Sequence, residues 1–313
     1  MGIVNTLGSF VYRTTYASLN RTTIDATKDR VLDFLGGALF ESNGEMVKPL
    51  LKTFEGYGGV KESSVVGRKE KLPCPLAASI NSGMAFDTGD IPHTGVMAIA
   101  AALATSEAEA KTRSISGKDL ILSIVLGYEV AMRVEHAMIP SPFARKFDPT
   151  GIVGPLAAAA AASKILAFEE AKATNALSIS ASLGIGSIEA SRPPRPFILI
   201  QVGRACEAGV LSALLAREGV QGSDTMLEKG FVPTFSERLQ LDSIEKGLGE
   251  DFGISKTSIK LHGGCRCLHA PVDTISQIVS EHRIAHEDIE RINVQVCAGT
   301  ITEDLDMEYP DNG

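Results

Sequence analysis

Residues 87–93 carry the first side chains whose types could do chemistry. The run reads Asp-Thr-Gly-Asp-Ile-Pro-His and lies between two segments of helical pattern. A carboxylate at Asp87 and an imidazole at His93 could remove a proton next to a substrate carboxylate and return one to the leaving group. In the alternative interpretation, Asp87 and Asp90 only cap the next helix, because Asp is an ordinary N-cap residue, and His93 is a surface residue.

Asp148 and a pair of arginines are further polar candidates. Asp148 stands directly before Pro149 at the start of an alanine-rich segment, where it could act as a base or cap the helix. Arg192 and Arg195 lie in a proline-rich run. Because a guanidinium binds a carboxylate through two parallel hydrogen bonds, they could hold an acidic substrate. Otherwise they are solvated loop residues.

Residues 260–269 contain the ligand types of a metal site. The run Lys-Leu-His-Gly-Gly-Cys-Arg-Cys-Leu-His has two histidines and two thiols, which are side chains that bind zinc. Cys265 and Cys267 are two residues apart, so on a helix they would point in different directions. We therefore expect no metal here.

Segments with apolar residues at helical spacing must position these groups. They cover residues 22–40, 46–57, 73–84, 96–109, 118–137, 154–168, 169–183 and 204–218. Six consecutive alanines at 157–162 allow helix axes to approach closely, because Ala adds little bulk and loses no side-chain entropy. The sequence predicts a mainly α fold, with a large all-helical domain over residues 1–250.

The pattern changes after about residue 247. Residues 251–261 alternate, residues 272–282 are amphipathic, and residues 292–296 show the period of two of a strand. This order predicts a small α/β lid domain over residues 251–313. The acidic end of the chain has no core-forming pattern, and so few elements bury too little apolar surface to stand alone. We therefore expect the lid to be truncated.

Composition argues against several classes of partner. A net charge of −8 and an aromatic fraction of 5% are poorly suited to binding nucleic acid. The longest weakly charged stretch, 151–168, is interrupted by Pro155 and Lys164, so no membrane span is expected. The five cysteines are an odd number, and residues 1–20 show no secretory pattern. These features predict a cytoplasmic protein with free thiols, or one of the mitochondrial matrix in a eukaryote.

Taken in order, these landmarks resemble the MmgE/PrpD family. That family includes 2-methylcitrate dehydratase, cis-aconitate decarboxylase and iminodisuccinate epimerase. The resemblance runs from about residue 5 to about residue 300 and is most specific at residues 116–133, 150–151 and 203–218. It implies a helical domain, a smaller lid and a cleft between them, with homodimers and no required cofactor. It also implies a lyase or isomerase that acts on a small di- or tricarboxylate by acid–base chemistry.

The resemblance assigns roles to several candidates. His93 would be the acid–base residue and Asp87 its partner or a second base. Lys260, a further catalytic candidate, would hold substrate carboxylates together with Arg266 at a helix N-terminus. His269 would contact the substrate or position that helix.

The chain departs from the family pattern at four polar positions. They are Ala85, Asp148, Ile198 and Gln201, where the family has Asp, His, Lys and His. Arg192 and Arg195 could replace some of the lost charge. The alternative function is a catalytically dead or regulatory homologue that keeps the dimeric scaffold. In either case the apolar helix faces favour a homodimer made through the helical domain.

Overall fold

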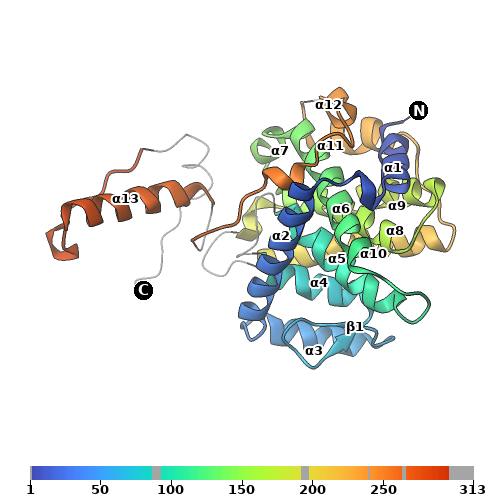
Figure 1. Ribbon diagram of the computed structural model, residues 1–313, viewed down its shortest axis with the longest axis horizontal. Helices are drawn as coiled ribbons and strands as arrows, with labels where there is room; N and C mark the ends of the chain where they lie inside the picture. Colours follow the sequence, from blue (N-terminus) through green and yellow to red (C-terminus); the bar gives the residue numbers. More distant parts are fainter. Residues whose placement is uncertain (1, 87–92, 192–196, 239, 263–265, 296–313) are drawn as a thin grey trace.

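The alanine-rich segment forms α8 (Pro149–Ile165), and the main helices of the fold pack around it (Figure 1). The computed structural model describes residues 2–86, 93–191, 197–238, 240–262 and 266–295. The other α-helices in these ranges are α1 (Ile3–Arg13), α2 (Arg21–Glu41), α3 (Val47–Tyr57), α4 (Cys74–Met84), α5 (Thr94–Glu109), α6 (Gly117–Met138), α7 (Ser141–Ala144), α9 (Glu170–Ser182), α10 (Ile198–Arg217), α11 (Val232–Phe235), α12 (Asp242–Glu245) and α13 (His269–His282). Strands β1 (Ser63–Ser64) and β2 (Lys71–Leu72) form a small antiparallel pair. The expectation of a mainly α fold is confirmed.

Close packing around α8 defines the core. Helices α5, α6, α9 and α10 all contact it, and every residue from Pro149 to Ser163 is buried. A Cβ added at Gly209 of α10 would lie 2.3 Å from the carbonyl oxygen of Pro155. Real side chains cannot approach backbone that closely, so glycine is what lets α10 come near α8.

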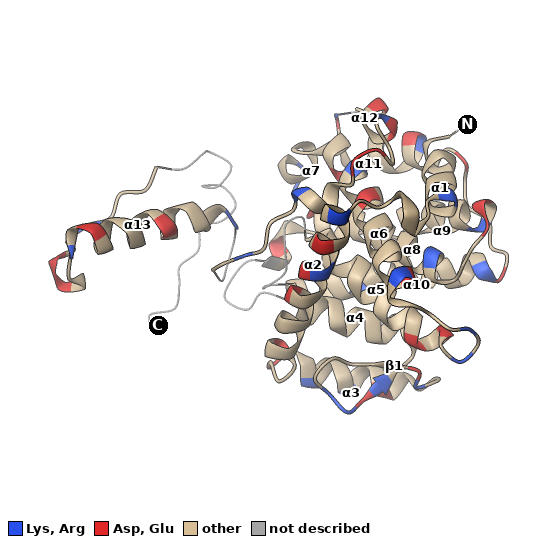
Figure 2. Ribbon diagram, in the orientation of Figure 1, with Lys and Arg blue, Asp and Glu red and all other residues tan. Residues whose placement is uncertain are grey.

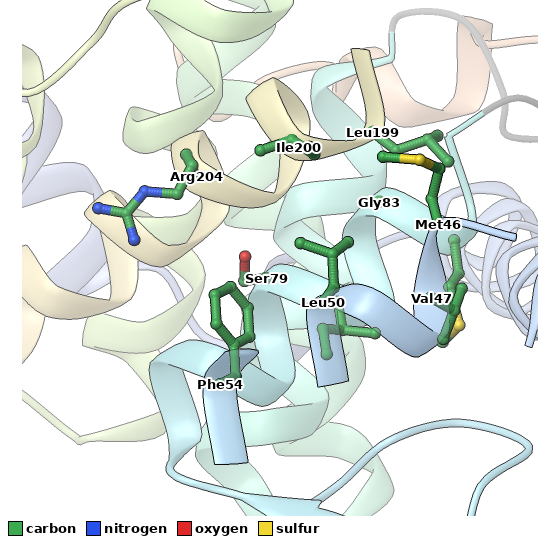
Figure 3. A pocket seen from close by; sticks show the side chains of 11 residues that line it. Met46, Val47, Leu50, Phe54, Ser79, Gly83, Leu199, Ile200 and Arg204 are labelled. Carbon is green, nitrogen blue, oxygen red and sulfur yellow. The ribbon is translucent and has the colours of Figure 1, made fainter. Parts of the chain in front are cut away.

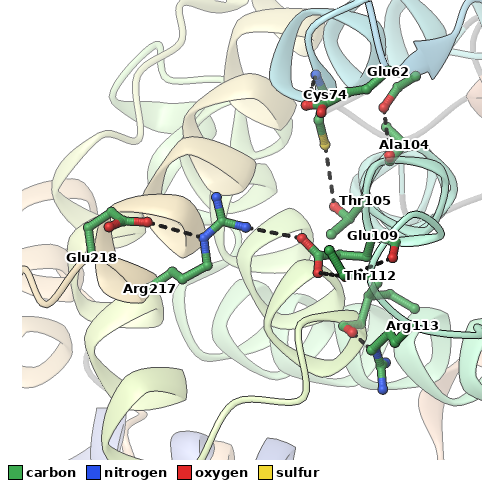
Figure 4. A network of polar contacts seen from close by, with 11 residues as sticks. Glu62, Cys74, Ala104, Thr105, Glu109, Thr112, Arg113, Arg217 and Glu218 are labelled. Carbon is green, nitrogen blue, oxygen red and sulfur yellow. Dashed lines mark hydrogen bonds and ion pairs between the residues drawn. The ribbon is translucent and has the colours of Figure 1, made fainter. Parts of the chain in front are cut away.

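Charged side chains tie the ends of the helices together at the rim of the body. Helix α4 carries no charged residue and α8 carries only Lys164, so both are drawn almost wholly in tan in Figure 2. At the rim, Arg217 of α10 pairs with Glu109 of α5 at 3.0 Å and with Glu218 at 3.3 Å (Figure 4). Such exposed pairs contribute little stability, and the buried apolar faces supply most of it.

The eight segments predicted as helices are all helical, but two begin earlier than expected. Helix α8 begins at Pro149 and α10 at Ile198, several residues before the predicted starts. Gly151 and Gly154 of α8 and Gly203 of α10 lower the helix propensity near both starts, and burial against neighbouring helices overrides that cost. Helix α1 was not predicted, because no side chain caps its N-terminus and so no start signal marks it.

Arg133 joins α6 to α12 and to the chain that follows it. Its Nε lies 2.5 Å from Glu129 Oε1, and its guanidinium donates to the carbonyls of Ile244 at 3.0 Å and Gly247 at 2.9 Å. The other oxygen of Glu129 accepts from the backbone N–H of Gly253 at 2.7 Å. This part-buried network anchors the segment that leads to Lys260.

The C-terminal strands predicted within residues 251–261 and 292–296 stay predictions, because the described residues there show one bridge position, at Ser258, and no extended strand. Gly253–Lys256 is a 3₁₀ turn, and residues 292–295 have no regular structure. A strand is stable only beside a partner, and an alternating pattern does not supply one. The amphipathic segment does form a helix, α13, which lies away from the body (Figure 1).

The division at residue 250 into two domains stays a prediction. Phe252 and Ile254 lie in the core of the helical body, with 2% and 0% of their surfaces exposed. Arg30 of α2 donates to both the hydroxyl and the carbonyl of Thr257 at 2.7 Å. The chain is therefore held to the helical body as far as Thr257.

Candidate functional site

His93 lies directly before the first residue of α5 and is largely removed from water. Its ring packs against the ring of Phe86, with 4.6 Å between the centroids. Its Nδ1 is buried and has no hydrogen-bond partner among the described residues. Burial, helped by the positive charge of Lys260, lowers the pKa of His93 to about 3. The imidazole is therefore neutral at physiological pH and can accept a hydrogen bond from a ligand or donate one to it.

Glu135 faces the start of α5 from the last turns of α6. The hydroxyl of Thr94, the neighbour of His93, donates to Glu135 Oε2 at 3.5 Å. Burial, together with the nearby charge of Asp148, raises the pKa of Glu135 to about 7. A carboxyl group that titrates near neutral pH is well suited to acid–base work.

Asp148 begins α8 and is 6% exposed. One of its oxygens accepts from the backbone N–H of Thr150 at 3.0 Å, as an N-cap residue does. The other accepts from the side-chain amide of Gln201 on α10 at 2.6 Å. Burial raises the pKa of Asp148, and these hydrogen bonds act in the opposite direction. The capping interpretation of Asp148 is therefore confirmed, while its role as a base stays a prediction.

Gln201 fixes the loop that lies against the start of α8. Its side-chain oxygen accepts from the backbone N–H of Ser187 at 2.9 Å, while its amide donates to Asp148. A Cβ added at Gly151 would lie 2.6 Å from the carbonyl oxygen of Ile185. Glycine at this position therefore lets the loop pack directly on the first turn of α8.

A second group of side chains gathers around the start of α13. The rings of His262 and His269 lie 5.2 Å apart, and His262 Nε2 is 2.7 Å from Asp273 Oδ1. His269 is buried, and its Nε2 has no hydrogen-bond partner among the residues described. Burial and the nearby charge of Arg266 lower its pKa.

Lys260 connects the two groups electrostatically. Its side chain is part-buried, and its charge lowers the pKa of both His93 and His269. An acid–base cluster on the helical body therefore lies within reach of a positively charged segment. Among the described residues, no group of three or more His, Cys, Asp or Glu side chains is placed to hold a metal ion.

The structure brings together several of the residues predicted from the sequence. His93, Asp148 and Lys260 belong to the two neighbouring groups, and Arg266 lies beside His269. Three predicted residues lie outside the described ranges, namely Asp87, Arg192 and Arg195. Of the departures from the family pattern, Ala85 and Ile198 are buried apolar residues.

Two members of the cluster were missed by sequence reasoning. Thr94 follows His93 directly, but an isolated Thr at a helix start carries no functional signal. Glu135 interrupts a run of buried residues on α6, since Met132, Val134 and Met138 around it are all buried. A carboxylate on the inward face of a helix was the signal that could have identified it.

A separate small cavity lies between α3, α4 and α10 and is lined mainly by apolar side chains (Figure 3). Leu50, Phe54 and Leu199 line it, with Arg204 at its edge. Its volume of about 20 Å³ suits a single water molecule. It is too small for a carboxylate metabolite, so the polar cluster remains the candidate site.

The family model described as the MmgE/PrpD N-terminal domain matches residues 5–243 of this chain. The chain belongs to the MmgE/PrpD family. It is 32% identical over 219 residues to cis-aconitate decarboxylase of Homo sapiens, which covers 66% of this chain and 45% of the relative. It is 27% identical over 259 residues to cis-aconitate decarboxylase of Aspergillus terreus, a match that covers 75% of this chain and 53% of the relative.

A longer match is to the cis-aconitate decarboxylase-like protein oryM of Aspergillus oryzae, 24% identical over 310 residues, with 90% of this chain and 63% of the relative covered. The chain spans about half the length of most of the curated relatives that it matches. The MmgE/PrpD match ends before Lys260, so the helical body carries the family assignment and the basic segment lies outside the matched domain.

Proposed function

We propose that this MmgE/PrpD chain carries the acid–base residues of a lyase that acts on a small unsaturated tricarboxylate, with cis-aconitate as the first candidate. The observation that carries the proposal is the buried imidazole of His93, whose Nδ1 has no hydrogen-bond partner among the described residues and whose pKa is lowered by burial and by the charge of Lys260. Relatives named cis-aconitate decarboxylase favour loss of carbon dioxide over the other family reactions. Dehydration and epimerisation of related acids are the alternatives to be tested beside it.

In this proposal the two groups of side chains divide the work. Lys260 and Arg266 hold substrate carboxylates through charge-assisted hydrogen bonds. His93, with its unpaired Nδ1, contacts the reacting part of the substrate as a neutral donor or acceptor. The chemistry is proposed to need only protein side chains, so activity should survive treatment with a chelator.

The test is turnover by the purified protein. The protein is incubated with cis-aconitate, 2-methylcitrate and citrate, while release of carbon dioxide and formation of unsaturated acids are followed by NMR. We expect Lys260→Gln to raise KM by about tenfold or more, because a charge-assisted contact is worth about 1.5–3 kcal/mol. The matched control is Lys256→Gln, since Lys256 is exposed and pairs with Asp251 at 2.5 Å. Absence of turnover on every acid at high protein concentration would contradict the proposal.

A second candidate function is a non-catalytic member of the family that keeps the scaffold. The observation that favours it is the hydrogen bond between Gln201 and Asp148 at 2.6 Å. Asp148 and Gln201 both depart from the family pattern, and each of them uses hydrogen-bonding capacity on the other instead of on a ligand. A thermal-shift screen with polycarboxylates separates the two functions, because a ligand at a hundredfold excess over Kd stabilises by about 2.7 kcal/mol. A scaffold protein should show no shift.

We also propose that the protein is a homodimer made through its helical body. Helix α2 carries an exposed apolar stripe, in which Leu32, Leu39 and Phe40 are 72%, 53% and 78% exposed. These residues are seven and eight positions apart, so they lie on one face of the helix. A stripe of this kind suits a symmetric interface between two copies of the chain.

A further inference from the structure

We propose that Glu135 is the proton donor of this site and that its enclosure beside Asp148 makes it the protonated member of the pair. The proposal deepens the proposed function and rests on it, because a donor needs a reaction to serve. It assigns the step to a residue that was not among the candidates from the sequence.

The position of Glu135 on α6 brings it into the polar cluster. Tyr128 and Ala131, seven and four residues earlier on the same face, are fully buried. This face therefore points toward the core, where α5 and α8 pack against α6. The carboxyl group meets Thr94 at 3.5 Å, directly beside His93.

Two carboxyl groups enclosed near each other cannot both be charged without a high cost. Helices α6 and α8 pack against each other, and the short segment between them brings the last turns of α6, with Glu135, to the start of α8, where Asp148 lies. Among the described residues, neither group has a cation within ion-pair distance. One of the two must therefore hold a proton over much of the neutral range.

The hydrogen bonds decide which group takes the proton. Asp148 accepts two N–H bonds, at 3.0 Å from Thr150 and at 2.6 Å from Gln201. These bonds stabilise its ionised form. Glu135 has one long contact with a hydroxyl group, so its charge is compensated much less. The proton therefore resides on Glu135.

Other charged groups near Glu135 do not change this assignment. They include Arg133 and His136 on α6, His93 before α5, Lys260 in the C-terminal segment, and Arg238, whose guanidinium donates to the carbonyl of Ile139 and to Gln240. Arg133 is engaged with Glu129. His136 is exposed, and His93 is neutral because burial lowers its pKa. The charge of Lys260 acts on His93, and Asp148 provides the charge that acts on Glu135.

The chemical step needs a proton of this kind. In a decarboxylation, the bond between the substrate carbon and the departing carboxylate breaks, its electron pair stays on the substrate, and carbon dioxide leaves. The electron pair then forms a C–H bond with the Glu135 proton, while the electrons of the O–H bond remain on Glu135. Solvent water returns a proton to the carboxylate before the next turnover.

The first experiment follows the proton directly. Difference infrared spectroscopy of the full chain records the band of a protonated carboxyl group between pH 5 and pH 9. In the wild type we expect a band that is lost with a midpoint of about 7. Glu135→Gln should abolish it, and Asp148→Asn should move the midpoint down by about one pH unit or more, because the like charge is gone. Glu207→Gln is the matched control, since this half-buried carboxylate pairs with Arg204 outside the cluster.

The second experiment measures turnover on the acid that the protein converts. Glu135→Gln should lower kcat by about 10²- to 10⁴-fold with little change in KM. Asp148→Asn should retain activity at low pH and move the basic limb of the kcat profile to lower pH. Asn is also a good N-cap residue, so this variant keeps α8 intact and remains informative if Glu135→Gln does not fold.

Each outcome decides one part of the proposal. A neutral-pH band that persists in Glu135→Gln would place the proton elsewhere and overturn the assignment. A wild-type kcat in that variant would overturn the donor role. Absence of turnover on every acid would remove the proposed function and the donor role with it. The infrared band would still show whether Glu135 carries the proton and whether the charge of Asp148 shifts the pH at which that proton is lost.

Discussion

Glu135 makes the stability of the fold depend on pH in a direction that can be predicted. Its pKa is about 7 in the folded state, against an ordinary value of 4.5. The folded state therefore binds the proton more tightly, and stability contributed by the neutral form is lost as pH rises from 4.5 through 7. Glu135→Gln should leave the unfolding free energy nearly unchanged at pH 4.5 and raise it by about 2–3 kcal/mol at pH 8.

Urea unfolding at the two pH values measures this difference. The same change on Glu170, a carboxylate outside the cluster that pairs with Arg13 at 3.2 Å, serves as the control and should not give a gain that grows with pH. An effect of Glu135→Gln that is equal at pH 4.5 and pH 8 would show that the group does not titrate between them.

Residue roles could be predicted only in part from the sequence. His93 and Asp148 were candidates because their residue types and the neighbouring helix starts were visible in the chain. Glu135 was not, because its properties come from Asp148, which joins it only when α6 and α8 pack together. The bond between Asp148 and Gln201 joins residues 53 positions apart, a distance at which one sequence gives no pairing signal.

At the scale of elements, α10 packs so closely on α8 that a larger residue at Gly209 should destabilise the fold. Gly209→Ala would place a Cβ 2.3 Å from the Pro155 carbonyl oxygen and 2.6 Å from the Ala158 Cβ. Overpacking of this kind costs about 1–3 kcal/mol, so we expect a clear fall in Tm. The control is Gly36→Ala on α2, where nothing lies within 4 Å. That change should be neutral or stabilise by up to about 1 kcal/mol. Equal Tm values for the two variants would contradict the packing described for α8.

Helices were predicted well from the sequence, whereas the C-terminal strands stay predictions. A helix satisfies its own backbone groups, so its apolar spacing is a local signal. The alternating residues 251–261 and 292–296 needed partner strands, and alternation does not reveal whether a partner exists. The starts of α8 and α10 were placed too late for a related reason, since tertiary packing extends both helices into their glycines.

At the scale of the whole molecule, the exposed stripe on α2 leads to a prediction about assembly. Light scattering should give about twice the 33.1 kDa chain mass across a tenfold dilution. Leu32→Glu combined with Phe40→Glu should give a monomer, because charges would enter an apolar interface. Val220→Glu is the control, since Val220 is an exposed apolar residue outside α2. A wild-type monomer at all concentrations would contradict the dimer.

The anchor formed by Arg133, Glu129 and Gly253 fixes one end of the C-terminal segment to α6. Residues up to Thr257 are fastened to the helical body, whereas α13 lies away from it (Figure 1). Lys260 is only three residues beyond the fastened end, and α13 begins twelve residues beyond it. The position of Lys260 relative to the helical body is therefore set by a short length of chain, whereas α13 is joined to the body through a longer one.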